Sequence, residues 1–326
     1  MSMHVGILPT DVLDALLAKL NETDAPQNLR VLRLPHPRTG LPSLFLPYMN
    51  RDGKSSIAEV QMVAPPNERS WFLTEGQVIQ DGKLLLMTPV DPAFLLLPIL
   101  QVLAPTNDQP GTFRPMDDIF EEAIEKLSQT TRSNKDPAAC LCKEDLLYFV
   151  SLDCARKAMA RTCETKQITD ELAVYRYSPD IVVESLKKKV TRLNSQSIFE
   201  ASRTLTRGLA KDGLMDDGKD HLLELGRLKA ACDLVSHYVP EHLQKRLLAS
   251  YDFTALDKHL KSLNDEAAAL AAADMNKMEL KESKSSATEK AAGKKRKTAS
   301  TGVEKLKKVN TKGMAKLSTF FQPKAS

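Results

Sequence analysis

The run Lys83-Leu84-Leu85-Leu86-Met87-Thr88-Pro89-Val90-Asp91-Pro92 carries the change from strand to helix on which the fold depends. Its first half holds four consecutive apolar residues, which is typical of a strand that is covered on both faces. Asp91 then offers an acceptor for free backbone N–H groups, and Pro92 suits the first position of a helix. The run therefore predicts a buried strand followed at once by a helix, which Pro98 should end or kink.

The residues before this run carry a β pattern as well. Four further segments have the composition of strands, at 29–34, 43–46, 57–63 and 70–73. The dipeptides Thr39-Gly40, Asp52-Gly53 and Asp81-Gly82 separate segments and supply the positive φ of tight hairpin turns. We expect antiparallel strands with short connections, and apolar sheet surface that another chain would cover.

Beyond residue 112 the pattern becomes helical. Candidate helices cover 117–128, 143–162, 179–193, 222–238 and 240–251. The helix over 179–193 places its apolar residues inward and Lys187, Lys188, Lys189 and Arg192 largely outward, so these four are candidate nucleic-acid contacts. A basic helix followed by a turn-rich loop or wing over 194–220 would suit a winged-helix unit. A solvated helix face is the alternative interpretation of the same four charges.

Charge divides the chain into an acidic body and a basic tail. Residues 274–326 hold 14 Lys and Arg against 5 Asp and Glu, so the tail carries +9 and the body −5 within a net charge of +4. The tail composition cannot bury enough apolar surface to fold, and only 264–274 has marginal helicity. Lys294, Lys295, Arg296 and Lys297 favour a nuclear import signal, and hence the nucleus, with an ordinary charge run as the alternative.

Two adjacent aromatic residues lie close to the end of the chain. Leu317, Phe320 and Phe321 stand at i, i+3 and i+4, so one helical turn would gather them on one face. The pattern resembles the peptide by which replication and repair proteins bind the DNA sliding clamp (PCNA), with Met314 in place of its Gln. We expect clamp binding weakened by roughly the 0.5–1.5 kcal/mol of one hydrogen bond. The alternative is that both Phe fold back on the protein's own surface.

Several chemistries are disfavoured by the residues present. Glu59 is the sole acidic residue in the predicted strands, whereas phosphodiester cleavage requires several carboxylates around two metal ions. Residues 208–213 lack the Lys and Ser or Thr of a nucleotide loop, and the five cysteines lack zinc spacing. Their odd number favours reduced thiols in an intracellular protein. The apolar run 93–100 is far shorter than the ~20 residues of a membrane span. We expect no catalytic residue, no metal, no cofactor and no membrane role.

Four blocks of the sequence resemble the B subunit of eukaryotic type 2 ribonuclease H. The first joins Ser70-Trp71-Phe72-Leu73 to the run 82–97 with its Thr-Pro-Val-Asp-Pro core. The others are Phe113-Arg114-Pro115-Met116-Asp117, then Tyr175-Arg176-Tyr177-Ser178, and residues 234–243. The basic tail that ends in the clamp-like peptide, including its Met, is also similar. The resemblance runs from about residue 4 to the end and is weakest over 128–170 and 194–225.

This resemblance implies an α+β chain in three parts. Residues 1–105 would form an antiparallel β-barrel-type domain within a triple barrel shared with a partner subunit, residues 106–262 a helical, winged-helix-like domain, and residues 263–326 a disordered basic tail. Candidate interface residues are Trp71, Phe72, Leu84, Leu86 and Phe94.

The same resemblance implies a function in a complex. The chain would be a non-catalytic scaffold and recruitment subunit of a heterotrimer with a catalytic A subunit, on which Mg²⁺ is expected, and a C subunit. That complex would degrade RNA in RNA–DNA hybrids and incise at ribonucleotides embedded in DNA, in replication and ribonucleotide excision repair. The alternative function is a stand-alone nuclear winged-helix DNA-binding factor associated with replication.

Overall fold

The computed structural model describes residues 4–21, 30–74, 76–104, 111–132, 141–170 and 172–288. Residues 1–260 form one compact unit and residues 261–326 a second. The predicted import signal and the predicted clamp peptide lie outside the described residues.

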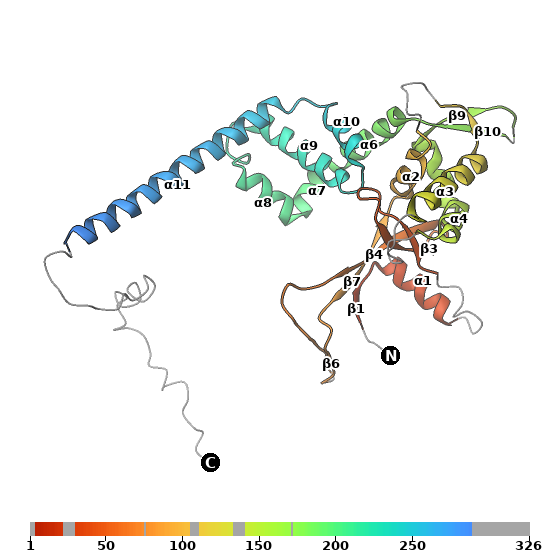
Figure 1. Cartoon of the computed structure of the whole chain (residues 1–326), viewed down its shortest axis with the longest axis horizontal. Coiled ribbons are helices and arrows are strands. Elements are labelled where there is room, and N and C mark those ends of the chain that lie inside the picture. Colours follow the sequence, from red (N-terminus) through yellow and green to blue (C-terminus); the bar gives the residue numbers. More distant parts are fainter. Residues whose placement is uncertain are drawn as a thin grey trace, which may run out of the picture. The chain divides into compact units, whose positions relative to one another are not determined.

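A five-stranded sheet in the order β1-β7-β4-β3-β2 forms the N-terminal part (Figure 1). Its strands are β1 (Val5–Ile7), β2 (Leu32–Pro35), β3 (Pro42–Met49), β4 (Ser55–Val63) and β7 (Leu84–Val90). Neighbouring strands are antiparallel as predicted, except that β1 runs parallel to β7. Gly40 and Gly53 have φ values of 69° and 68°, which confirms two of the predicted turns.

Helices cover the sheet on both faces. On one face α1 (Thr10–Asn21), which the sequence analysis did not predict, places Val12 against Leu46, Tyr48 and Ala58. On the other face, Leu32 and Phe45 join a core with residues of α2 (Pro92–Gln101), α3 (Met116–Arg132), α4 (Lys143–Ser151) and α5 (Asp153–Ala158). The described strands therefore share a core with the helices that follow them in the chain.

The junction between β7 and α2 forms as the sequence predicts. Asp91 accepts a hydrogen bond from the Ala93 N–H at 2.9 Å, and Pro92 is the first helical residue. The sequence analysis expected Pro98 to end or kink this helix. The helix does not end there and continues to Gln101. Burial of Leu96 and Leu100 on either side of the proline stabilises the helix through packing, which outweighs the local cost of proline.

The next segment has the arrangement of a winged helix. The single predicted helix over 143–162 is instead α4, α5 and the 3₁₀ turn η2 (Met159–Arg161), with a break at Leu152. Strands β9 (Cys163–Gln167) and β10 (Ala173–Tyr177) follow as a hairpin and pair with β8 (Arg114–Pro115). Because β9 and β10 follow directly after α5, this hairpin is the wing, and the predicted wing over 194–220 is wrong.

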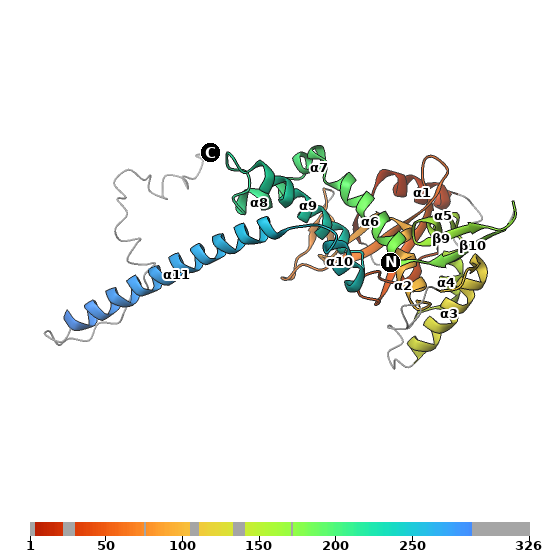
Figure 2. The same ribbon diagram turned by 90° about the horizontal axis from the view of Figure 1, so that it is seen from above.

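Helices pack around a second core in the remainder of the first unit (Figure 2). Ser178 caps α6 (Pro179–Leu193), which has the predicted bounds. Residues 194–220 hold α7 (Gln196–Ala201) and α8 (Arg203–Lys211) rather than a loop, because Phe199 and Leu209 are buried in this core. Two further helices complete it, α9 (Asp220–Ser236) and α10 (Glu241–Leu248).

A long helix, α11 (Thr254–Thr288), runs through the start of the predicted tail. The prediction of disorder is therefore wrong over residues 263–288. Its many Ala residues, with Leu, Lys, Glu and Met between them, have high intrinsic helix propensity, which the sequence analysis weighed too lightly. The rest of the predicted tail lies outside the described residues.

Candidate subunit-assembly surface

Strands β4 and β7 continue beyond the sheet into a two-stranded hairpin of β5 (Trp71–Phe72) and β6 (Val78–Ile79). The hairpin projects away from α2, α3 and α4 (Figure 1). The Trp71 indole N–H donates to the Lys83 carbonyl oxygen at 3.1 Å, which fixes the base of the hairpin. A Cβ added to Gly82 would lie 2.4 Å from the Arg69 carbonyl oxygen. Gly82 is therefore required by this close approach, and not by the positive φ that the sequence analysis assigned to it.

Exposed apolar side chains follow the hairpin and the adjoining end of the sheet. We call five of them the uncovered strip: Ile7, Met62, Val63, Phe72 and Val78, of which Phe72 is 82% exposed. Ile7 lies opposite Leu86, and Leu84 lies opposite Val63, so these four side chains share one face of the sheet, whereas Met62 lies on the other face. Apolar surface that the described part of the chain leaves uncovered marks a candidate site of association.

The two edge strands of the sheet, β2 and β1, differ in how far the described chain covers them. On β2 the backbone N–H of Arg33 donates to the Asp145 carboxylate of α4 at 2.9 Å, and Arg30 pairs with the same carboxylate at 2.6 Å. That edge is covered by the chain itself. Within the described residues no strand pairs with the outer edge of β1. An edge of this kind can accept a strand from a second chain.

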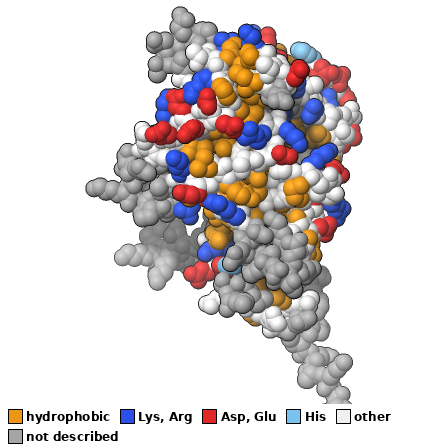
Figure 3. Space-filling view, turned by 90° about the vertical axis from the view of Figure 1, so that its right-hand side faces the viewer, with side chains coloured by type: hydrophobic (Ala, Val, Ile, Leu, Met, Phe, Trp, Pro, Cys, Tyr) orange, Lys and Arg blue, Asp and Glu red, His pale blue; other side chains and the backbone are white. Residues whose placement is uncertain are grey.

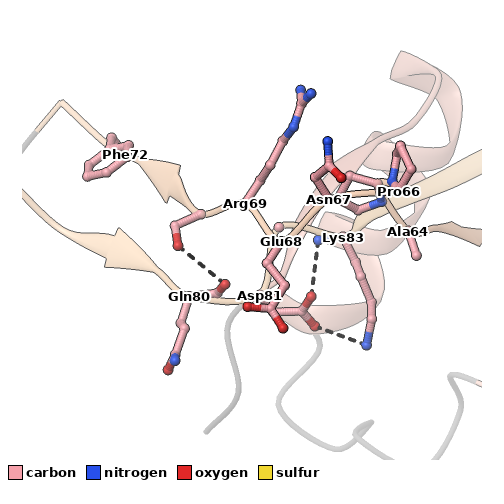
Figure 4. Close-up of a pocket in the computed structure, with 12 residues that line it drawn as sticks. Ala64, Pro66, Asn67, Glu68, Arg69, Phe72, Gln80, Asp81 and Lys83 are labelled. Carbon is pink, nitrogen blue, oxygen red and sulfur yellow. Dashed lines mark hydrogen bonds and ion pairs between the residues drawn. The ribbon is translucent and has the colours of Figure 1, made fainter. Parts of the chain in front are cut away.

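A cleft of about 670 Å³ lies at the base of the hairpin (Figure 4). It is lined by residues 64–70, 72 and 80–83. At its edge the backbone N–H of Lys83 donates to the Asp81 carboxylate at 3.0 Å, and the Lys83 ammonium lies 3.6 Å from the same carboxylate. Arg69 extends away from this pair (Figure 4). Charged side chains thus border the apolar hairpin, as at the rim of a protein–protein interface.

Four of the five candidate interface residues lie together. Trp71 and Phe72 are on the hairpin, and Leu84 and Leu86 are on β7 beside β1. Phe94 lies elsewhere, on α2. Its ring centroid is 5.7 Å from that of Tyr238, and the Lys189 ammonium is 5.0 Å from it. Phe94 therefore packs within its own chain.

Glu59, the acidic residue of the predicted strands, takes part in a buried contact between sheet and helices. It is 1% exposed and accepts a hydrogen bond from the Tyr238 hydroxyl at 2.6 Å. His36 Nε2 lies 3.7 Å from its other carboxylate oxygen. Burial and the Glu59 carboxylate both raise the pKa of the Tyr238 hydroxyl above its ordinary value. The contact joins residues 179 positions apart, so nothing local in the sequence signals it.

Two further acidic residues, at the start of α3 and before α9, also have partners within the chain. Asp117 pairs with Arg156 at 2.9 Å, and Asp216 pairs with Lys219 at 3.0 Å. In the part of the chain that the structure describes, no three His, Cys, Asp or Glu side chains gather as metal ligands would. The described helices include none with the length and apolar content needed to cross a membrane.

The four candidate nucleic-acid residues on α6 differ in their ion-pair partners. Lys187 pairs with Glu184 at 2.8 Å, and Lys189 pairs with Asp91. Lys188, Lys189 and Arg192 line a cleft of about 360 Å³, and Lys187 is not among its lining residues. Burial by itself would raise the pKa of the Asp91 carboxyl, but hydrogen bonds from Lys189 and Ala93 and the charges of Lys189 and Arg161 lower it below its ordinary value.

Outside the hairpin, apolar and charged side chains are mixed on the surface. The side of the molecule seen in Figure 3 shows apolar side chains in a band that basic and acidic side chains interrupt. Leu147 and Tyr148 are exposed apolar residues of α4. The Arg30 guanidinium lies 5.1 Å from the Tyr148 ring centroid, so a charged group lies beside this apolar surface.

The fold defines a class of protein in which a triple-barrel domain precedes a winged-helix domain. Residues 7–91 match the family described as Ydr279p protein triple barrel domain. Residues 94–248 match the Ydr279p protein family (RNase H2 complex component) wHTH domain. The chain belongs to this family, that of the ribonuclease H2 B subunits, and is a component of a ribonuclease H2 complex.

Curated relatives agree with this assignment. The chain is 27% identical to the ribonuclease H2 B subunit of Xenopus tropicalis, across 95% of this chain and 93% of the relative. It is 24% identical to the B subunit of Bos taurus, across 75% of this chain and 69% of the relative. A shorter match, with 33% identity over 29% of this chain and 31% of the relative, links it to the B subunit of Schizosaccharomyces pombe.

Proposed function

We propose that this chain is the non-catalytic scaffold and recruitment subunit of a heterotrimeric ribonuclease H2, assembled with a catalytic A subunit and a C subunit. The observation that carries the proposal is the uncovered strip beside the unpaired edge of β1. Association removes such apolar surface from water, which stabilises the complex. A C subunit that adds strands beyond β1 and covers the hairpin would complete the shared barrel.

The complex would degrade RNA in RNA–DNA hybrids and incise at ribonucleotides embedded in DNA, during replication and ribonucleotide excision repair. Mg²⁺ would bind the catalytic subunit. This division of roles is supported by the engagement of Glu59 with Tyr238, which leaves that carboxylate in a structural contact. The scaffold therefore contributes assembly and positioning, and the cutting groups belong to its partner.

Recruitment rests on the two sequence patterns of the tail. Lys294, Lys295, Arg296 and Lys297 would direct the chain to the nucleus. The terminal peptide with Met314, Leu317, Phe320 and Phe321 would bind the sliding clamp (PCNA) and bring the complex to replicating DNA.

The alternative function, a stand-alone winged-helix DNA-binding factor, has less support. In helix-turn-helix proteins the second helix of the pair enters the major groove. The helix that precedes the wing here is α5, which packs against α2 and β4. One side of α5 is therefore taken up by packing within the chain, while Lys157 on this helix is 77% exposed.

The proposal is tested by the substitution Phe72→Ala in the co-expressed complex. Full burial of a Phe side chain contributes about 1.5–3 kcal/mol, so the affinity for the C subunit should fall about 10- to 150-fold. Leu172→Ala is a matched control, because Leu172 is an exposed apolar residue outside the uncovered strip. Equal affinities of the Phe72→Ala variant and the unsubstituted chain would contradict the proposed assembly surface.

A further inference from the structure

The cleft beside α6 is lined by basic side chains from two elements. Arg161 comes from η2, and Lys188, Lys189 and Arg192 come from α6. We call these four residues and the space between them the basic groove. Ser185, Lys188 and Arg192 stand at i, i+3 and i+7, so they lie on one face of α6.

The positive charge of the basic groove exceeds the negative charge around it. Arg161 and Lys189 share the Asp91 carboxylate, with Arg161 Nη1 at 2.6 Å from its oxygen. Glu184 also lines the cleft, but it pairs with Lys187 outside it. Among the described residues, Lys188 and Arg192 are exposed and have no ion-pair partner. The side chains of Lys188 and Arg192 thus remain free in the cleft, whereas Arg161 and Lys189 are held by the Asp91 carboxylate.

The spacing of the two free cations suits a phosphate backbone. Four residues of an α-helix rise about 6 Å, close to the ~6.8 Å that two nucleotides of one strand span along a duplex axis. The planar guanidinium of Arg192 can donate two parallel hydrogen bonds to one phosphate, and the Lys188 ammonium supplies a second point charge.

The surfaces that a winged helix ordinarily uses are less suited to this contact. Helix α5 is packed against α2 and β4. At the tip of the wing, Asp170 is exposed between Ile168 and Leu172, which are 52% and 44% exposed. An acidic and apolar tip does not attract phosphates. We propose that the basic groove, with Lys188 and Arg192 as the contacting residues and Arg161 and Lys189 as its fixed wall, binds the phosphate backbone of the nucleic-acid duplex on which the complex acts.

This inference rests on the proposed function, and its test uses the complex of the full chain with its partner subunits. The double variant Lys188→Ala/Arg192→Ala is compared with Lys157→Ala/Lys245→Ala, which removes the same charge from side chains that are 77% and 73% exposed. Gel filtration first establishes assembly of each complex. Fluorescence anisotropy with a labelled RNA–DNA hybrid then gives the affinity at several salt concentrations.

Each phosphate contact contributes about 0.9 to the slope of log K against log salt. Loss of two contacts should lower that slope by about 1.8, so between about 50 and about 200 mM salt the double variant should lose about 12-fold less affinity than the unsubstituted complex. The control variant should keep the original slope. A thermal unfolding curve of each complex shows whether both variants remain folded.

An unchanged slope in an assembled, folded double variant would overturn the inference. If calorimetry shows that this variant has also lost binding of inorganic phosphate, the groove is a site for small anions instead. A chain that does not elute with its partner subunits contradicts the proposed function instead, so the two failures are distinguishable.

Discussion

The contact between Glu59 and Tyr238 gives a prediction whose magnitude follows from the structure. Tyr238→Phe removes the hydroxyl that donates to the Glu59 carboxylate at 2.6 Å, and Glu59 is too deeply buried for water to replace it. A hydrogen bond to a charged group contributes about 1.5–3 kcal/mol. For a unit of this size one kcal/mol corresponds to about 2–4 °C, so the melting temperature should fall by roughly 3–12 °C.

Tyr177→Phe is the matched control for this change. In the described part of the chain the buried Tyr177 hydroxyl has no hydrogen-bond partner, and burial raises its pKa to about 12. Its removal strands no other group, so stability should stay the same or rise. Calorimetry of the chain purified with its partner subunits measures both variants. Equal melting temperatures for Tyr238→Phe and Tyr177→Phe would refute the reasoning.

Three further changes have defined outcomes. Gly82→Ala should disrupt the base of the hairpin, because its Cβ would clash with the Arg69 carbonyl oxygen, and weaken binding of the C subunit in a pull-down. Asp91→Asn should destabilise the chain by about 1–3 kcal/mol at pH 7. Because the folded pKa of Asp91 is lowered, its contribution is present above the ordinary pKa of 3.8 and lost as pH falls through the folded value, so urea titrations of the two proteins should converge in acid. Phe320→Ala with Phe321→Ala should abolish clamp binding in a pull-down and leave assembly and hybrid cleavage intact; clamp binding that survives would contradict the motif.

Local signals in the sequence account for the parts of the fold that were predicted correctly. Ser178 and Pro179 determine the start of α6, and Asp91 with Pro92 determines the start of α2, because caps act on neighbouring N–H groups. Consecutive apolar residues in β7 correctly indicated a strand in the interior of the sheet, where β1 and β4 pair with it on either side. These signals depend on residues that are close together in the chain.

The errors of the sequence analysis come from long-range packing. The parallel pairing of β1 with β7 and the burial of Glu59 against Tyr238 join distant segments, so no local pattern indicates them. Helices α7 and α8 are short, and they exist because the core accepts Phe199 and Leu209. Strand β9 is rich in polar residues and lacks the apolar alternation of a typical strand, which explains why it was missed.

The central claim is that a second subunit covers the hairpin and the edge of β1. A photoreactive benzoylphenylalanine in place of Phe72, in the co-expressed complex, tests this most directly, with the same group in place of Tyr148 on α4 as the control. Mass spectrometry of the products should identify a covalent adduct of position 72 with the C subunit and none of position 148. Absence of that adduct at position 72 in an assembled complex would contradict the claim.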